Sequence, residues 1–372
     1  MNLRILMVDR AGAQSIWSIM GVLRGALEAR GHEVHTCRWD DGGGACEDRF
    51  VPGPRDHVIE VPPRRNATEI FLQHRQFAHA FVPLLKKLKP AAVHVNFVVP
   101  GAIVALLARR SGVPLVLATR HELARSMAPH LRLFSALAAR SIDVKAHVSK
   151  VVADSYGVSN APLRGGARSI VIHNGLDLNS LARISPWPCT AGATTIIVCG
   201  RMVAVKGHAR TLPAFRLAAA KDPTLRLEFV GDGPMRPALE AEVARLGLGM
   251  RVAFHGWRPR EETLSRMRSA ALVVVPSSKV QEGFGLVLAE AMAMQCSIVA
   301  SDIAVFREVA ALGHGVCLLE TTNPQALADV MLCPPPAASA DPAKLDQSAM
   351  IAAYLALYEA EMGTRRLASP KG

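Results

Sequence analysis

Residues 282–290 read Glu282-Gly283-Phe284-Gly285-Leu286-Val287-Leu288-Ala289-Glu290, a glycine-rich loop followed by an apolar segment. The apolar run 272–275 before it is typical of a buried strand, and the apolar positions after the second glycine have a helical period. A helix that begins at such a loop presents backbone N–H groups and the positive end of its dipole to an anion. The stretch therefore predicts a strand, a phosphate-binding turn and a helix.

Two carboxylates, Glu282 and Glu290, lie on either side of this turn. On a helix that begins near Gly285, Glu290 lies one to two turns along the axis while Glu282 stays in the loop. A diphosphate at the turn would then have room for a hydroxyl-bearing ring on each side. A pair of glutamates at this spacing also arises by chance, and two solvated surface charges are the simpler interpretation. The surrounding motifs have to decide between the two.

The composition is that of a globular protein with one large or two ordinary domains, since 50% of its 372 residues are hydrophobic. Its seven cysteines form no C-x2-C pair and no metal-like group with histidine, which favours reduced packing residues in a cytoplasmic protein and predicts no metal site. The N-terminus lacks the apolar core of a signal peptide. The longest apolar stretch, residues 97–108, is shorter than the ~20 residues that span a bilayer.

The net charge of +12 is concentrated in the first half of the chain. Residues 1–180 contain 23 Lys and Arg against 14 Asp and Glu. Such an excess suits anionic ligands, an anionic membrane surface or nucleic acid. A soluble surface that is rich in arginine is the equally weighted alternative.

Apolar runs of strand length alternate with helical patterns in two successive series. The first series opens as a βαβ unit, but without G-x-G-x-x-G, which disfavours a dinucleotide-dependent dehydrogenase. We expect a first α/β domain over residues 1–178, a linker over 179–194, a second α/β domain over 195–345 and a C-terminal helical segment over 346–372. Residues 123–140 are expected to form one basic amphipathic helix, for packing or for membrane contact.

Two further loops carry candidate site residues. His121 follows the predicted strand 114–118, at the carboxyl end where open α/β sheets bind ligands, although a lone histidine in a loop is more often structural. Arg201 and Lys206 lie in the loop after the predicted strand 195–199. The loop is not a Walker A motif, yet its cations suit phosphate oxygens, because Arg offers a fork of donors and Lys a point charge.

Together these motifs resemble the retaining glycosyltransferases of family 4, which have the GT-B architecture of two facing Rossmann-like domains with parallel sheets and an interdomain cleft. The resemblance extends over nearly the whole chain, and the order and spacing of the motifs carry it. They are the Gly12 turn, residues 30–34, His94, His121, residues 174–177, Gly200-Arg201, Lys206-Gly207, residues 231–234, Phe254 with Gly256, Pro276-Ser277 and residues 282–290.

The resemblance implies a role for each candidate. Arg201 and Lys206 would hold the donor diphosphate together with the backbone N–H groups of Gly283, Phe284 and Gly285. Glu290 would accept hydrogen bonds from the ribose. Glu282 would lie against the donor sugar, His121 would approach its reacting side from the first domain, and Gly12 would let the first loop approach the phosphates. The C-terminal helix would cross back to the first domain.

The resemblance also implies the chemistry: transfer of a sugar from a UDP-, GDP- or ADP-sugar, with retained configuration and with no cofactor or obligatory metal. Consistent with this, the sequence has no D-x-D triplet. The expected partners are the nucleotide sugar, a glycan or lipid-linked acceptor and an anionic membrane surface at the cytoplasmic face, and not nucleic acid. The alternatives are a nucleotide-sugar epimerase and a non-catalytic protein that binds anionic surfaces.

Overall fold

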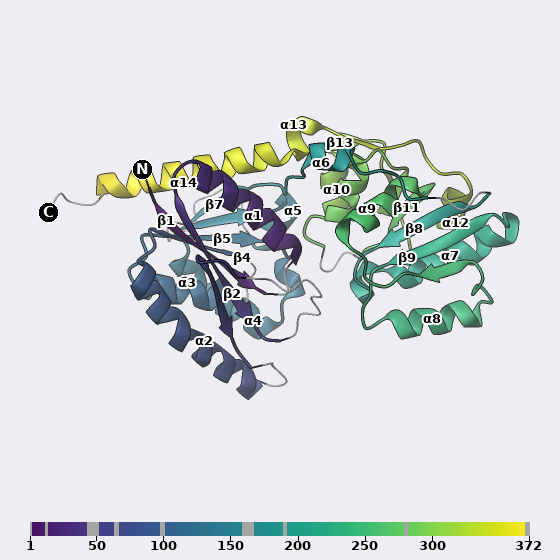
Figure 1. The fold of residues 1–372 in the computed structure, drawn as a ribbon. Helices are drawn as coiled ribbons and strands as arrows, with labels where there is room; N and C mark the ends of the chain where they lie inside the picture. The colour runs from purple at the N-terminus through teal and green to yellow at the C-terminus, as the bar shows by residue number, and fades with distance from the viewer. Residues whose placement is uncertain are drawn as a thin grey trace. The chain divides into compact units, whose positions relative to one another are not determined.

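The computed structural model describes residues 2–11, 14–42, 52–62, 67–96, 101–157, 167–188, 192–278 and 282–368. The chain divides into two compact units, of which the first contains Met1–His173 and Met350–Gly372 and the second contains Asn174–Ala349 (Figure 1). Both units are built from parallel strands and helices.

The first unit alternates strands and helices and ends with a helix from the C-terminus of the chain. Its elements are β1 (Arg4–Arg10), α1 (Gln14–Ala29), β2 (Glu33–Asp40), β3 (Asp56–Glu60), α2 (Ala67–Leu88), β4 (Ala92–Asn96), α3 (Gly101–Arg110), β5 (Leu115–Arg120), the 3-10 turn η1 (Ala124–Ser126), α4 (Pro129–Ala138), the 3-10 turn η2 (Ala139–Ser141), β6 (Val144–His147), α5 (Lys150–Ser155), β7 (Arg168–Val171) and α14 (Gln347–Ala368).

The described strands of this unit form one parallel sheet in the order β3-β2-β1-β4-β5-β6-β7. Successive side chains of a strand point to opposite faces, and β1 shows this alternation clearly. Ile5 and Met7 pack with α1 and α14 on one face, whereas Leu6 and Val8 pack with α2 and α3 on the other (Figure 1). The strand order reverses between β1 and β4, which is where sheets of this kind bind ligands.

The segment 123–140 is not the single helix that its amphipathic pattern predicts. The backbone is extended at Met127 (φ −83°, ψ 143°) and Ala128 (φ −60°, ψ 149°), so η1 and α4 are separate elements. The cause is Pro129, because a proline disfavours the helical conformation of the residue before it. Proline at the first position of α4 then starts a new helix.

The second unit repeats the same plan. Its elements are α6 (Leu178–Ala182), β8 (Thr194–Cys199), the 3-10 turn η3 (Ala204–Lys206), α7 (His208–Lys221), β9 (Leu225–Val230), α8 (Arg236–Arg245), β10 (Val252–Phe254), α9 (Arg260–Ser269), β11 (Leu272–Val275), α10 (Leu286–Ala293), β12 (Ile298–Ser301), α11 (Ala304–Ala310), β13 (Gly313–His314), β14 (Cys317–Leu319), α12 (Pro324–Leu332), β15 (Ser339–Ala340) and α13 (Pro342–Leu345).

Its main sheet has the order β10-β9-β8-β11-β12-β14 within the described residues, and its paired strands are parallel. Helices α7, α8 and α12 cover one face of it with a continuous apolar core, and α9 and α10 pack against strands β8, β11 and β12 (Figure 1). The order reverses between β8 and β11. The predicted α/β class with two parallel, Rossmann-like sheets is therefore confirmed.

Candidate active site

The loop after β8 packs closely on the segment after β11, at the reversal of strand order in the second unit. Gly207 ends this loop with φ 72°, and a Cβ atom at this position would lie 2.0 Å from the carbonyl oxygen of Pro276. The backbone N–H of Ser278 donates to the carbonyl oxygen of Val205 at 2.7 Å. Glycine is required here both for the left-handed backbone and for the close approach.

An ion pair joins the two segments. The ammonium group of Lys206 donates to Oε2 of Glu282 at 2.7 Å, and the side chains are 32% and 12% exposed. Glu282 is therefore not a solvated surface charge. Two residues that are 76 positions apart, and that the sequence assigned to the same site, are brought together by the neighbouring strands β8 and β11.

Arg201 begins the same loop and is exposed. Across the described ranges, its side chain takes part in no hydrogen bond or ion pair. The loop thus carries one cation that is neutralised by a carboxylate and one that faces solvent. The solvent-facing guanidinium is the group with donors available for an anion.

The glycine-rich loop turns into α10 as the sequence predicts. Gly285 has φ 88°, and a Cβ atom there would lie 2.5 Å from the ring of Phe306 on α11. Gly283 and Phe284 are buried immediately before it. The first turn of α10 therefore directs its backbone N–H groups toward the loop, since these groups have no partner within a helix.

Glu290 lies on α10 with only 7% of its surface exposed, and it forms an ion pair with Arg260 at the start of α9. Burial raises the pKa of Glu290, and the guanidinium of Arg260 opposes that shift. Arg260 was not among the candidates from the sequence. It lies 30 positions before Glu290, and no local pattern links the two.

A second residue that the sequence did not single out is His208, the first residue of α7. Its side chain is 3% exposed and packs against the ring of Phe229. Burial, followed by the charge of Lys206, lowers its pKa to about 4. A neutral imidazole therefore lies beside the cationic loop at physiological pH.

A cavity of about 260 Å³ opens at the carboxyl ends of β11, β12 and β14. Six of the seven residues that line it have polar or charged side chains. The lining residues are Arg210, Ser278, Ser301, Asp302, Ile303, Glu320 and Thr322.

In the first unit, His121 follows β5 and is partly buried. Its Nε2 atom lies 3.0 Å from Oδ1 of Asn96, the last residue of β4. Burial lowers the pKa of His121 to about 3, so the ring is neutral at pH 7. Gly12, the remaining candidate, lies outside the described residues.

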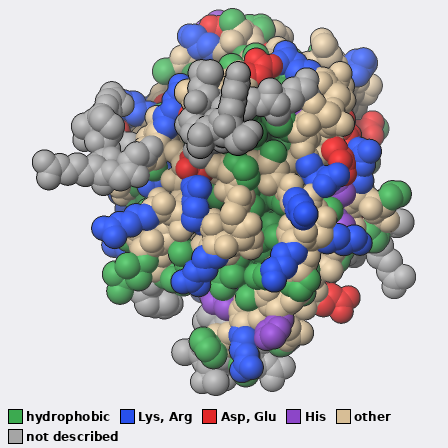
Figure 2. Space-filling view, turned by 90° about the vertical axis from the view of Figure 1, so that its left-hand side faces the viewer, with side chains coloured by type: hydrophobic (Ala, Val, Ile, Leu, Met, Phe, Trp, Pro, Cys, Tyr) green, Lys and Arg blue, Asp and Glu red, His purple; other side chains and the backbone are tan. Residues whose placement is uncertain are grey.

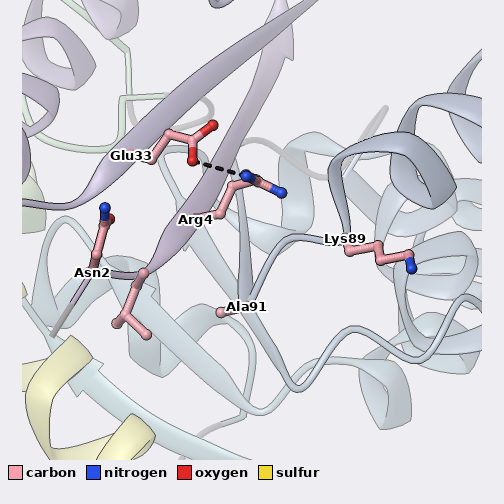
Figure 3. A pocket seen from close by; sticks show the side chains of 6 residues that line it. Asn2, Arg4, Glu33, Lys89 and Ala91 are labelled. Atoms are coloured by element: carbon pink, nitrogen blue, oxygen red, sulfur yellow. Dashed lines mark ion pairs between the residues drawn. The ribbon is translucent and has the colours of Figure 1, made fainter.

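Another cavity, of about 400 Å³, lies at the other edge of this sheet, among the amino ends of β1, β2 and β4 (Figure 3). Arg4 and Glu33 form an ion pair of 3.0 Å in it, and the side chain of Lys89 points away from this pair. Parallel sheets bind ligands at their carboxyl ends, so this cavity is not the candidate site.

The described residues contain no group of three or more His, Cys, Asp or Glu side chains placed to hold a metal ion. None of their helices is long and apolar enough to cross a membrane.

Known protein families match both units. Residues 21–180 match the family described as Glycosyltransferase Family 4, and residues 189–332 match the family described as Glycosyl transferases group 1. The two matches together span most of the chain. The chain belongs to the family 4 and group 1 glycosyltransferases, as the sequence motifs predicted.

Among the curated relatives is the phosphatidyl-myo-inositol mannosyltransferase of Mycobacterium tuberculosis, 34% identical over 148 residues, which are 39% of this chain and 38% of that protein. A D-inositol 3-phosphate glycosyltransferase of Corynebacterium urealyticum is 32% identical over 146 residues, 37% of this chain and 34% of the relative. These matches thus cover well under half the length of either relative.

Solved structures show the same fold over nearly the whole chain. Sucrose-phosphate synthase of Thermosynechococcus elongatus matches with a TM-score of 0.76 and 20% identity, over 97% of this chain and 100% of that one. HepE of Anabaena, in complex with UDP and glucose, matches with a TM-score of 0.72 and 18% identity, over 96% and 99%. The architecture is that of the GT-B glycosyltransferases, which confirms the predicted fold class.

Proposed function

We propose that this protein transfers a sugar from a nucleoside-diphosphate sugar to a glycan or lipid-linked acceptor, with retention of the anomeric configuration and without a metal ion. The observation that carries the proposal is the ion pair between Lys206 and Glu282 where the strand order of the second unit reverses. It joins a cationic loop to a glycine-rich helix start, and both features bind phosphates.

The charges fit the reaction. When the bond between the sugar and the diphosphate breaks, negative charge grows on the leaving phosphate oxygen. Arg201, Lys206 and the N–H groups at the start of α10 stabilise that charge, and they stabilise it more in the transition state than in the bound donor. These two cations then take the place that a divalent metal has in other transferases.

Glu290 is assigned to the ribose of the donor. Its buried carboxylate accepts hydrogen bonds from hydroxyl groups well when it is ionised, and Arg260 favours the ionised form. The retention of configuration is assigned to front-face transfer, in which the leaving phosphate helps to deprotonate the acceptor. Support for the donor class comes from the fold relative that was solved with UDP and glucose.

A panel of UDP-, GDP- and ADP-sugars tests the donor by thermal shift. A donor at 100 times its Kd stabilises the folded state by about 2.7 kcal/mol. A stabilising nucleotide sugar that is consumed when an acceptor is added supports the proposal. EDTA should leave that turnover unchanged. If none of the panel shifts the unfolding temperature, the proposed donor site is wrong.

We also propose that the acceptor lies at an anionic membrane surface. Leu133 and Leu137 on α4 are each 65% exposed, and Phe71 on α2 is 67% exposed. Contact between the rings of His74 and Phe134 joins these two helices. Figure 2 shows one face of the molecule on which Lys and Arg side chains outnumber acidic ones and alternate with hydrophobic side chains.

Exposed apolar side chains next to cations are the features by which amphipathic helices bind anionic lipid. Arg132 and Arg140 flank the two leucines and are exposed. The curated relative named for phosphatidyl-myo-inositol supports a lipid-linked acceptor.

Flotation with anionic vesicles at low ionic strength tests this surface. The double variant Leu133→Ser/Leu137→Ser should lose most of the bound fraction. Met250→Ser is the matched control, because Met250 is 95% exposed but belongs to the second unit. Equal binding of the double variant and the control would reject the assignment.

A further inference from the structure

We propose that Asn96 and Met20 are positioning residues that hold His121 in one tautomer, with its ring proton on Nε2 and the lone pair on Nδ1. The inference rests on the proposed function only for its effect on turnover. The tautomer itself follows from three side chains of the first unit, and it is measurable without any donor or acceptor.

The first step is the orientation of the Asn96 amide. Its nitrogen Nδ2 lies 2.9 Å from the thioether sulfur of Met20 on α1, and both side chains are 3% exposed. A thioether sulfur accepts weakly and carries no proton to donate. The amide nitrogen, which is a donor, therefore faces the sulfur, and the carbonyl oxygen Oδ1 faces the other way.

The second step is the bond to His121. Oδ1 of Asn96 lies 3.0 Å from Nε2 of His121, which is hydrogen-bond distance. A carbonyl oxygen only accepts, so the proton of this bond belongs to Nε2. In a neutral imidazole one nitrogen carries the proton and the other the lone pair, which places the lone pair on Nδ1.

The ring is neutral because of its surroundings. Burial lowers the pKa of His121 to about 3. His94, two residues before Asn96 on β4, is also buried and neutral, and its ring nitrogens lie at hydrogen-bond distance from the hydroxyl groups of Thr119 and Tyr358. Neither histidine therefore supplies a charge to the other at pH 7.

The consequence concerns the hydrogen-bonding character of the ring. A ring with its lone pair on Nδ1 presents an acceptor at that atom, whereas the other tautomer would present a donor there. Met20 and Asn96 thereby select the accepting form. The chain achieves this with residues from α1 and β4 that need not touch the substrate.

Nitrogen-15 spectra of the histidine rings test the inference directly, with the resonances of His121 assigned by their loss in His121→Gln. We expect the wild-type ring to be locked, with Nε2 protonated and its proton visible through slow exchange. In Asn96→Leu, which removes the acceptor, we expect ring nitrogen shifts averaged between the two tautomers. In Asn96→Asp, which keeps an accepting oxygen, Nε2 should stay protonated.

The variant Ser169→Ala is the matched control. The Ser169 hydroxyl lies 2.9 Å from Nε2 of His147, another buried histidine at the carboxyl end of a strand in the same sheet. The control should change the resonances of His147 and leave those of His121 as they are. Met20→Leu removes only the sulfur, and we expect partial averaging at His121.

Turnover gives the second readout. Asn96→Leu should lower kcat about 10- to 100-fold, as loss of a residue that orients a functional histidine does in other sites. The KM for the donor should change less than about twofold, because the charged groups assigned to the donor belong to the second unit. Asn96→Asp should restore part of the loss.

The outcomes separate the inference from the proposed function. A proton on Nδ1 in the wild type, or an unchanged locked ring in Asn96→Leu, overturns the positioning role whether or not the protein transfers sugars. A locked ring in Met20→Leu overturns the role of Met20 alone. A locked wild-type ring in a protein that uses no nucleotide sugar leaves the tautomer established and rejects the transferase proposal.

Discussion

The candidate site residues at the carboxyl edges of the two sheets have different kinds of partner. In the second unit, Lys206 pairs with Glu282 and Arg260 pairs with Glu290, and glycines let the loops approach each other closely. In the first unit, His121 and its neighbour His94 are neutral and make hydrogen bonds, although Arg10 and Asp41 form an ion pair of 2.6 Å at the ends of β1 and β2.

The difference follows from what each edge is proposed to bind. A diphosphate needs fixed charge, and ion pairs keep cations in place until the anion arrives. Neutral hydroxyl groups need acceptors and donors of fixed direction, and a buried histidine supplies both without a net charge. Substitutions at each edge test this contrast.

Removing the paired cation should have the largest effect. Lys206→Ala deletes a charge proposed to stabilise the leaving phosphate, and we expect kcat to fall about 10²- to 10³-fold. Turnover of the donor found in the panel is the measurement. Lys221→Ala, at the far end of helix α7, which follows the loop of Lys206, is the control and should keep wild-type kcat. Near wild-type turnover in Lys206→Ala would show that Lys206 does not stabilise the leaving phosphate.

The close approach of the two loops predicts a loss of stability. Gly207→Ala combines a left-handed backbone with a clash against Pro276, and we expect the free energy of unfolding of the second unit to fall by about 2–4 kcal/mol. Urea unfolding measures it. Gly192 has nearly the same φ, 74°, with nothing within 4 Å, so Gly192→Ala isolates the backbone strain, about 1 kcal/mol. Equal losses of stability in Gly207→Ala and Gly192→Ala would show that the contact with Pro276 adds nothing to the cost of the left-handed backbone.

Acid should destabilise the first unit more than the second. In the first unit, His94, His121 and His147 have pKa values lowered to about 3, 3 and 4, and burial lowers that of His57 as well; in the described part of the second unit, only His208 has a lowered pKa, about 4. Below pH ~6.5 these histidine rings bind protons in the unfolded chain but stay unprotonated in the folded chain. Each such ring therefore removes about 1.4 kcal/mol of stability per pH unit as the pH falls toward 4.

One group in the first unit acts in the opposite direction. Burial raises the pKa of Asp9 to about 7, so its contribution is present at low pH and is lost as the pH rises through 7. Asp9 therefore offsets the effect of one of these histidines between about pH 4 and 6.5. The difference between the two units in stability lost on acidification is expected to be smaller than the histidines alone would give.

Tryptophan fluorescence separates the two units in this experiment. Trp17 and Trp39 belong to the first unit, and Trp187 and Trp257 to the second. A variant that keeps only one of these two pairs of tryptophans reports on the unfolding of one unit. Its midpoint of urea unfolding is compared between pH 7 and pH 5. A second unit that loses as much stability as the first would contradict the assignment of neutral histidines.

The smallest effect is expected from the second ion pair. Arg260→Ala removes the charge that opposes the raised pKa of Glu290, so a larger fraction of the carboxylate is protonated and accepts the ribose hydroxyl groups less well. We expect donor affinity to fall about three- to tenfold with little change in kcat. Titration calorimetry with the nucleotide measures it. Arg258→Ala, two residues earlier, is the control. An unchanged affinity for the nucleotide in Arg260→Ala would show that Arg260 does not contribute to donor binding.

Local chemistry was readable from the sequence where it depends on neighbours along the chain. The periodic apolar runs predicted the strands, and the glycines of residues 282–290 predicted the turn into α10, because backbone conformation is set by adjacent residues. The same reasoning was wrong for residues 123–140, where the proline outweighs the apolar period. Glu282 and Glu290 were placed in the site only through a resemblance spread over the whole chain.

The class of fold, the two parallel sheets and the residue types at their carboxyl ends follow from the sequence. The pairing of side chains follows from the tertiary structure: Arg260 pairs with Glu290, and Asn96 contacts both Met20 and His121. Strand order, which joins segments far apart in the chain, sets these pairs. The charge and tautomer of a buried group depend on such neighbours in space, and no local pattern encodes them.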